Sequence, residues 1–212
     1  MALFEWLPAW QQSDVEIKNS DVVYSGFFKV DKLHLRHRQF SGEWSPWLVR
    51  EQIHRCDAAA VLLWDPKQDV VVMIEQFRVG LIGVASKQSP WILEIVAGLL
   101  EDNEEPKNTV YREAVEEAGC EIEELLAIGE FYNTPGAFAE KTYLYAGIVD
   151  ATNKGGHHGL PDEHEDIKVH VLPIPQVLAA LQSGELRTSA STVISLNWLK
   201  EKRRQMQSEK RV

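Results

Sequence analysis

The chain has 212 residues and a formal net charge of −10 at pH 7, from 22 basic and 32 acidic side chains. Apolar residues make up 44% and charged residues 25% of the sequence, which is ordinary for a globular protein of one domain or of a domain with an accessory element. The negative charge argues against nucleic acid as the main partner, although it is compatible with a small phosphate ligand whose charge is carried by metal ions.

The first half of the chain is predicted to be rich in strands. Residues 32–38 alternate apolar and polar side chains with a period of two, which indicates a half-buried strand. Two apolar segments, 58–64 and 70–76, flank the stretch 65–69 with its Asp and Pro residues, and this pattern predicts a β-hairpin. A further single strand is expected over residues 91–98.

The second half of the chain mixes helices with strands. A helix is predicted over 106–117, and Gly119 stands where a helix commonly ends in a left-handed residue. Further strands are expected over 125–132, 142–149 and 167–174, and further helices over 176–184 and 190–205. We therefore predict an α+β fold in which a few helices cover a mixed β-sheet. A β-rich N-terminal segment is expected over residues 1–55 and a second domain over residues 56–212.

The predicted helix over 106–117 carries its acidic side chains in an unfavourable arrangement. Glu113, Glu116 and Glu117 share one face, where like charges repel by roughly 0.2–0.5 kcal/mol per pair in an isolated helix. A solvated surface is the ordinary explanation of such a face. The alternative is that these carboxylates bind a hard divalent cation such as Mg²⁺, which takes oxygen ligands together with substrate phosphates. Arg112 is expected to point away from them and to pair with Glu104.

The acidic helix belongs to a longer pattern with fixed spacing. Gly98 is followed by five residues and Glu104, then by seven residues and the run Arg-Glu-Ala-Val-Glu-Glu-Ala-Gly-Cys over 112–120. This pattern resembles the signature of the Nudix hydrolases, with Ala114 and Cys120 smaller than the usual aliphatic residues at the two apolar positions. The resemblance implies an α/β/α sandwich around a mixed sheet. It also implies the hydrolysis of a diphosphate that is linked to another moiety.

Segments outside this signature are similar to the ADP-ribose pyrophosphatase branch of the family, and together they extend the likeness over nearly the whole chain. Within them, Pro135 lies sixteen residues beyond Gly119, where a proline is typical of that branch. The segments are 24–30, 49–55, 74–78, 134–141 and 159–171. The resemblance implies cleavage of ADP-ribose to AMP and ribose 5-phosphate, with Mg²⁺ as the cofactor and Mn²⁺ as its substitute.

The resemblance also implies roles for single residues. Glu163 would be the general base. The metal site would take a carbonyl oxygen and several carboxylates, from Ala97, Glu113, Glu116, Glu117 and Glu165. The substrate site would be lined by Arg50, Glu51, Arg55, Arg78, Leu99, Thr134, Pro135 and Gly136, with Glu140 on a ribose hydroxyl. Phe27 and Phe28 would contact the adenine from the partner subunit of a homodimer.

Several of these residues also have simpler explanations. Phe27 and Phe28 would point to opposite faces of a strand, so that one of them would belong to the core. Arg78 would make a structural salt bridge, and Glu140 would be a surface acid. For the whole protein, the alternatives are a hydrolase of another nucleoside-diphosphate sugar such as GDP-mannose, and a catalytically silent ligand-binding module. The intact acidic run argues against the silent module.

The cysteines and the longest apolar run indicate the compartment. Cys56 and Cys120 are too few for a disulfide framework, which favours a reducing compartment. The first ten residues lack the basic region and the long apolar stretch of a signal peptide. The apolar run over 58–64 is too short to span a bilayer. We therefore expect a cytoplasmic protein with no membrane partner.

Overall fold

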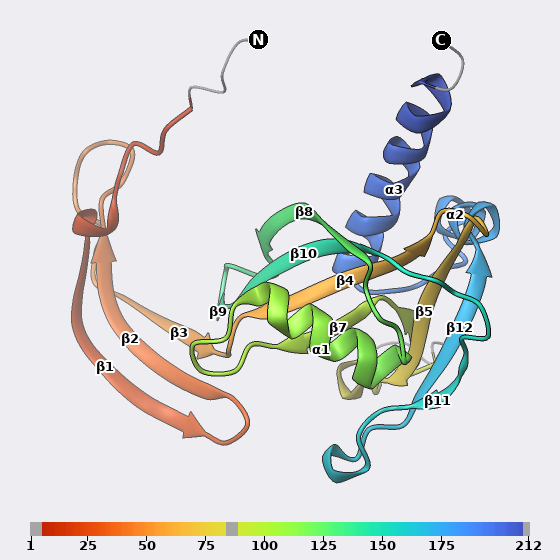
Figure 1. Ribbon diagram of the computed structural model, residues 1–212. Helices are drawn as coiled ribbons and strands as arrows, with labels where there is room; N and C mark the ends of the chain where they lie inside the picture. The colour runs from red at the N-terminus through yellow and green to blue at the C-terminus, as the bar shows by residue number, and fades with distance from the viewer. Residues whose placement is uncertain (1–5, 84–88, 210–212) are drawn as a thin grey trace. The chain divides into compact units, whose positions relative to one another are not determined.

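The computed structural model describes residues 6–83 and 89–209, whose path is drawn in Figure 1. These residues form two compact units. The first unit ends at Arg55 and also includes Thr134–Glu140, whereas the second unit comprises Cys56–Asn133 and the chain from Lys141 onward. The segment Thr134–Glu140 belongs to the first unit because its short strand pairs there, a long-range pairing that the linear sequence does not display.

The first unit is a four-stranded sheet with the order β1-β2-β3-β9. Its strands are β1 (Val15–Ser25), β2 (Lys29–His37), β3 (Leu48–His54) and β9 (Phe138–Ala139), preceded by the short 3₁₀ helix η1 (Gln12–Asp14). Strands β1, β2 and β3 are antiparallel, and β9 runs parallel to β3. Figure 1 shows β1 and β2 as a long curved hairpin. The strand predicted over 32–38 overlaps β2 and is confirmed.

The second unit contains a larger mixed sheet with the order β11-β12-β5-β4-β10-β8. Its strands are β4 (Ala58–Asp65), β5 (Val70–Phe77), β8 (Glu124–Tyr132), β10 (Lys141–Ile148), β11 (Gly156–His158) and β12 (Ile167–Pro173). Strands β4 and β10 are parallel, and the other neighbours on this path are antiparallel. The hairpin of β4 and β5 confirms the prediction from residues 58–76.

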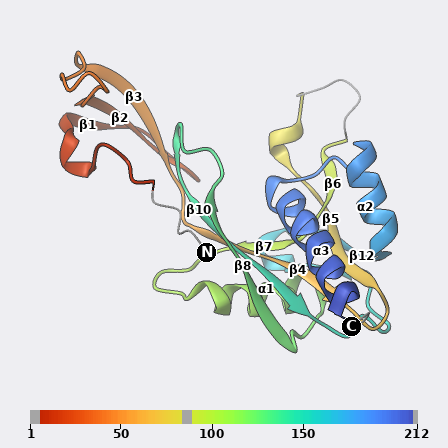
Figure 2. The ribbon, with the colours of Figure 1, turned by 90° about the horizontal axis from the view of Figure 1, so that it is seen from above.

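The hairpin strands β4 and β5 pair only near their turn, and another segment fills the space where they diverge. Strand β6 (Trp91–Glu94) pairs antiparallel with β5, and β7 (Val96–Leu99) pairs antiparallel with β4, with Ile95 unpaired between them (Figure 2). Since β4 and β5 run in opposite directions, the segment must bend at Ile95. The prediction of one strand over 91–98 was therefore wrong, because the apolar run carries no mark of the bend.

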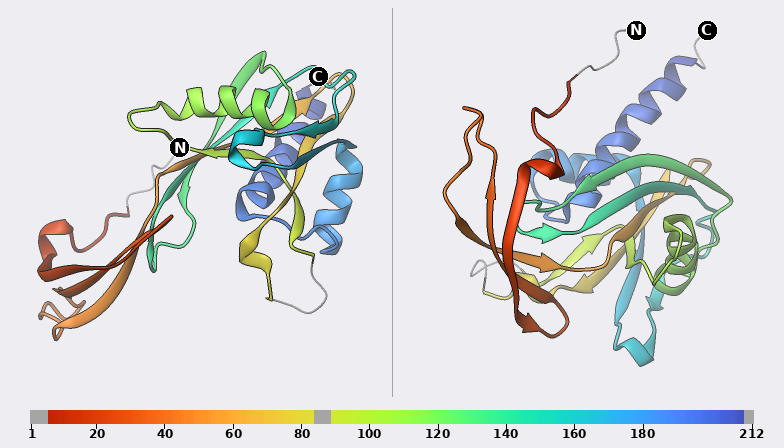
Figure 3. Two further views of the ribbon diagram at one scale, coloured as in Figure 1. Left: turned by 90° about the horizontal axis from the view of Figure 1, so that it is seen from below. Right: turned by 90° about the vertical axis from the view of Figure 1, so that its left-hand side faces the viewer.

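Three helices cover the two faces of this sheet (Figure 3). Helix α1 (Pro106–Ala118) begins with a proline and ends at Gly119, whose φ of 61° is left-handed. It packs Val110, Ala114 and Ala118 into a core that also contains Ile74 of β5. Helices α2 (Ile174–Ser183) and α3 (Ala190–Glu209) cover the opposite face. This helix–sheet–helix arrangement confirms the predicted fold class.

Among the helices in the described part of the chain, none is both long enough and apolar enough to cross a membrane.

Candidate functional site

The acidic face of α1 lies against strand β7. Glu113 is nearly buried, and its carboxylate packs directly on Gly98, where any Cβ would overlap it. Glu117 is buried one turn later, and its Oε2 accepts a hydrogen bond of 3.0 Å from the backbone N–H of Ala97. The glycine at position 98 therefore provides the space that lets the helix carboxylates reach the strand.

Arg112 lies among the carboxylates instead of pointing away from them. Its Nη1 donates to Glu113 Oε1 at 2.8 Å and to Glu116 Oε2 at 3.0 Å, while Nη2 lies 3.4 Å from Glu104 Oε2. The predicted pairing with Glu104 is therefore present, but the expectation that Arg112 points away was wrong. A guanidinium has enough donors to bridge three acids at once, and its rotamer does not follow from spacing.

The loop that follows β11 lies against the C-terminal part of α1. The backbone N–H of Gly159 donates to the carbonyl of Glu116 at 3.2 Å. Within the loop, Glu165 and Leu160 are joined twice, through Glu165 N–H to the Leu160 carbonyl and through Leu160 N–H to Glu165 Oε2. Glu163 ends the short 3₁₀ helix η3 (Pro161–Glu163), and its side chain lies outside the part of the molecule that the structure describes.

Burial destabilises the charged form of the carboxylates on α1. Burial raises the pKa of Glu117 to about 8, and the carboxylates of Glu113 and Glu165 add to the rise. Burial also raises the pKa of Glu113. Among the described side chains, no three acids, histidines or cysteines converge closely enough to hold a metal ion. A divalent cation would nevertheless offset this buried negative charge, and an all-oxygen donor set fits Mg²⁺ or Mn²⁺.

The raised pKa of Glu117 predicts how the stability of the metal-free protein depends on pH. The folded state binds more protons than the unfolded state between pH 4.5, the ordinary value, and about 8. The free energy of unfolding in EDTA should therefore fall as the pH rises through this window, and each lost kcal/mol lowers Tm by about 2–4 °C. Thermal melts should show that Glu117→Gln flattens this slope.

The same thermal melts should be repeated with Mg²⁺ in place of EDTA. Near pH 8, Mg²⁺ should raise the Tm of the unchanged protein. It should leave the Tm of Glu117→Gln almost unaffected, because the variant has lost one buried charge. A Tm in EDTA that does not change across the window would contradict the buried charge at Glu117.

Arg78 follows strand β5 and pairs with an acid that the sequence analysis did not single out. Its Nε donates to Glu94 Oε1 at 2.6 Å, and Glu94 is buried in β6. Burial raises the pKa of Glu117, whereas the charge of Arg78 lowers it, so this guanidinium acts on the acidic face of α1. The signal that could have revealed Glu94 was an acid inside an apolar strand, since such an acid needs a partner.

Phe27 and Phe28 lie in the turn between β1 and β2, so the expectation that a strand would place them on opposite faces was wrong. Their ring centroids are 5.0 Å apart in an edge arrangement, and Phe27 is 77% exposed. The guanidinium of Arg55 lies 5.8 Å from the ring centroid of Phe28, and its Nη1 is 3.6 Å from Glu140 Oε2. Four of the expected substrate residues therefore lie close together in the first unit, namely Phe27, Phe28, Arg55 and Glu140.

The other expected substrate residues are divided between the units. Arg50 and Glu51 are exposed neighbours on β3, and Arg50 Nη1 donates to the Val49 carbonyl at 2.8 Å. The turn over Thr134, Pro135 and Gly136 closes with hydrogen bonds of 3.1 and 3.0 Å to the Thr134 carbonyl and belongs to the first unit. Leu99 and Arg78 belong to the second unit, with all of the expected metal ligands.

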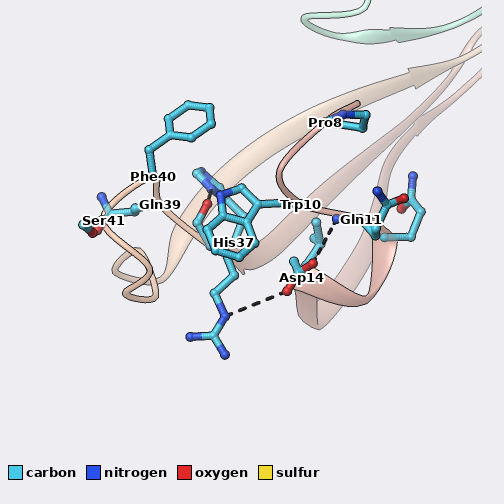
Figure 4. A pocket seen from close by; sticks show the side chains of 11 residues that line it. Pro8, Trp10, Gln11, Asp14, His37, Gln39, Phe40 and Ser41 are labelled. Carbon is cyan, nitrogen blue, oxygen red and sulfur yellow. Dashed lines mark hydrogen bonds and ion pairs between the residues drawn. The ribbon is translucent and has the colours of Figure 1, made fainter. Parts of the chain in front are cut away.

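A separate hollow of about 960 Å³ lies in the first unit (Figure 4). Trp10 and Phe40 contribute aromatic rings to its wall, and Arg38 Nε approaches Asp14 Oδ1 at 4.0 Å. None of the residues expected in the catalytic or substrate sites lines this hollow.

Comparison with known proteins adds family information to this geometry. A family model described as the NUDIX domain matches residues 54–191. The chain is 37% identical to an ADP-ribose pyrophosphatase of Haemophilus influenzae over 191 residues, 90% of this chain and 88% of the relative. It is 40% identical to one of Escherichia coli K12 over 188 residues, 89% and 88% of the two chains. A GDP-mannose pyrophosphatase of Citrobacter koseri is 38% identical over 151 residues, 71% and 76% of the two chains.

Proposed function

This chain belongs to the Nudix family of hydrolases, and we propose that it cleaves the diphosphate bond of ADP-ribose to give AMP and ribose 5-phosphate. The proposal is supported by the likeness to ADP-ribose pyrophosphatases, which extends over about nine-tenths of the chain. The observation that carries it in the structure is that the carboxylates of Glu113 and Glu165 both act on the buried Glu117, whose charge the guanidinium of Arg78 also favours.

The metal dependence is part of the proposal. Members of the family generally use a divalent metal, and we propose Mg²⁺, with Mn²⁺ as its substitute. Ala97 would provide a carbonyl oxygen, and the carboxylates would come from Glu113, Glu116, Glu117 and Glu165. When bound, the ion supplies charge compensation for the diphosphate and lowers the pKa of water. Arg112 would then have to share Glu113 and Glu116 with the ion.

The chain's own groups would carry out the remaining work. Glu163 would accept a proton from the attacking water, a task that requires a carboxylate within hydrogen-bond reach of that water. Arg78 would hold the negative diphosphate through its planar donors. Phe27, Phe28 and Arg55 would recognise the adenine side of the substrate, and Glu140 would accept a hydrogen bond from a ribose hydroxyl.

The second candidate substrate is another nucleoside-diphosphate sugar, which is favoured by the likeness to a GDP-mannose pyrophosphatase over a shorter part of the chain. Initial rates with Mg²⁺ decide between the two. We expect ADP-ribose to give the highest kcat/KM, with AMP and ribose 5-phosphate as products in equal amounts. A higher kcat/KM for GDP-mannose would make that compound the substrate instead of ADP-ribose. If neither compound is hydrolysed, the remaining explanation is a ligand-binding module without catalytic activity.

We also propose that the protein is a homodimer formed through the first unit. In β1, Ile17, Val22 and Tyr24 are each more than half exposed, although they are apolar or aromatic. Exposed apolar side chains along an edge strand favour association with another chain. The family resemblance assigns Phe27 and Phe28 to the site of the partner subunit, which would make the dimer necessary for full activity.

Light scattering should give twice the chain mass, and Ile17→Glu should yield monomers that have lost most of their activity. Ile194→Glu is a matched control, because Ile194 is also exposed and apolar but lies on α3 in the second unit. A monomer that keeps full activity at nanomolar concentration would contradict the dimer.

A cytoplasmic location completes the proposal. It is supported by the two cysteines, since Cys56 and Cys120 are both free and Cys56 is exposed.

A further inference from the structure

We propose that Glu94 is a positioning residue that orients Arg78 toward the diphosphate, and that two threonine hydroxyls, one just before α3 and one in its first turn, hold Glu94 in place. The inference rests on the proposed function, because it concerns how the substrate is bound. Glu94, Thr188 and Thr192 lie outside the Nudix signature.

The contact between Glu94 and Arg78 fixes one edge of the guanidinium. Nε of Arg78 donates to Oε1 of Glu94 at 2.6 Å, and the side chains are 41% and 7% exposed respectively. Among the described residues, the guanidinium donates no other hydrogen bond, so Nη1 and Nη2 remain for a ligand. A long side chain that is already oriented loses less rotamer freedom when it binds an anion.

The strand register places this pair on the side of the sheet that carries the acidic helix. Glu94 stands opposite Ile74 in the antiparallel pair of β6 and β5, so the two side chains share one face. Ile74 packs into the core formed with α1. Arg78 lies four residues after Ile74 in extended backbone, and the period of two keeps it on that face.

The backbone on both sides of Glu94 is held from outside the sheet. Thr188 Oγ1 donates to the carbonyl of Leu93 at 2.6 Å. The N–H of Ile95, the unpaired residue at the bend, donates to Thr192 Oγ1 at 3.1 Å. Thr192 is completely buried. The bend therefore has its backbone groups satisfied by two threonines, which keep the Glu94 carboxylate beside Arg78.

The first test is a kinetic cycle with Glu94→Gln, Arg78→Ala and the double variant. Glu94→Gln should raise KM for ADP-ribose about 10-fold, the size expected when a charge-assisted hydrogen bond that orients a binding group is lost. Its kcat should stay within about twofold of the unchanged enzyme, since the diphosphate charge exists before the transition state. The double variant should be no worse than Arg78→Ala alone, because Glu94 acts through Arg78.

The second test concerns the threonine contact and decides the matter if Glu94→Gln fails to fold. Thr192→Val keeps the shape but removes the hydroxyl, so it should raise KM in the same direction, and Thr192→Ser should restore the original value. Ser195→Ala is the matched control, because Ser195 lies on the same helix, is equally buried, and its hydroxyl has no partner among the described residues. It should leave KM unchanged.

The outcomes separate this inference from the proposed function. An unchanged enzyme that does not hydrolyse ADP-ribose would refute the proposed function, and calorimetric binding of inorganic pyrophosphate with Mg²⁺ would then replace KM as the readout for Glu94→Gln. If the unchanged enzyme is active, an unaltered KM in Glu94→Gln would overturn the inference. Additive effects of Arg78→Ala and Glu94→Gln would also overturn it, as would equal losses in Thr192→Val and Ser195→Ala.

Discussion

Glu117→Gln is expected to lower kcat for ADP-ribose by roughly 10³-fold or more, the scale of several kcal/mol of charge stabilisation by a metal ion. The substitution keeps the size of the side chain and can still accept the hydrogen bond from the Ala97 N–H, so the fold should persist. It removes the buried charge that would hold the cation. The measurement is kcat over a range of Mg²⁺ concentrations, with the enzyme's Tm as a check on folding.

A matched control is available in the segment that follows α1. Glu123 is exposed and belongs to no expected site, so Glu123→Gln should leave kcat and the Mg²⁺ response unchanged. Full activity of the unchanged protein in EDTA, or of Glu117→Gln in Mg²⁺, would remove the basis for the metal site.

Glu163→Gln should lose at least about 100-fold in kcat, the range that a positioned general base contributes. Glutamine keeps the size and accepts a hydrogen bond, but it does not take up the proton of the attacking water. Binding of ADP-ribose and Mg²⁺ should therefore persist, as measured by calorimetry. Changing Glu165 to Gln should instead lower the apparent affinity for Mg²⁺, because that residue is expected to contact the ion.

Asp162 provides the control for the loop. It is an exposed acid in the same 3₁₀ turn, and Asp162→Asn should behave as the unchanged enzyme. A nearly normal kcat in Glu163→Gln would place the base elsewhere, with Glu116 as the next candidate.

Local patterns predicted the elements whose signals lie within a few residues. The hairpin over 58–76 was visible from two apolar runs around a turn, and α1 from its spacing and from Gly119. Strand β1 was not predicted, because its exposed side chains follow no regular alternation of apolar and polar residues. Strand β9 has two residues and exists only through its pairing with β3, so it carries no local signal.

The candidate site was predictable in its residue types but not in its pairings. The spacing of Glu113 and Glu117 indicated a shared face, and both are buried beside β7. The three carboxylate partners of Arg112 depend on a side-chain rotamer, and the partnership of Arg78 with Glu94 depends on strand register. Neither the rotamer nor the strand register can be predicted from a single sequence, because both are fixed by the packing of distant segments.

The bend at Ile95 also bears on the order in which the molecule assembles. Its hydrogen bond to Thr192 spans 97 positions of the chain, and that of Thr188 to Leu93 spans 95. Contacts between such distant positions form late, since the entropy of closing a long loop is lost before the contact stabilises anything. A growing chain on the ribosome therefore completes the acidic helix well before the bend is secured. If Glu94 orients Arg78 as proposed, the diphosphate-binding part of the site is complete only after α3 has packed against the sheet.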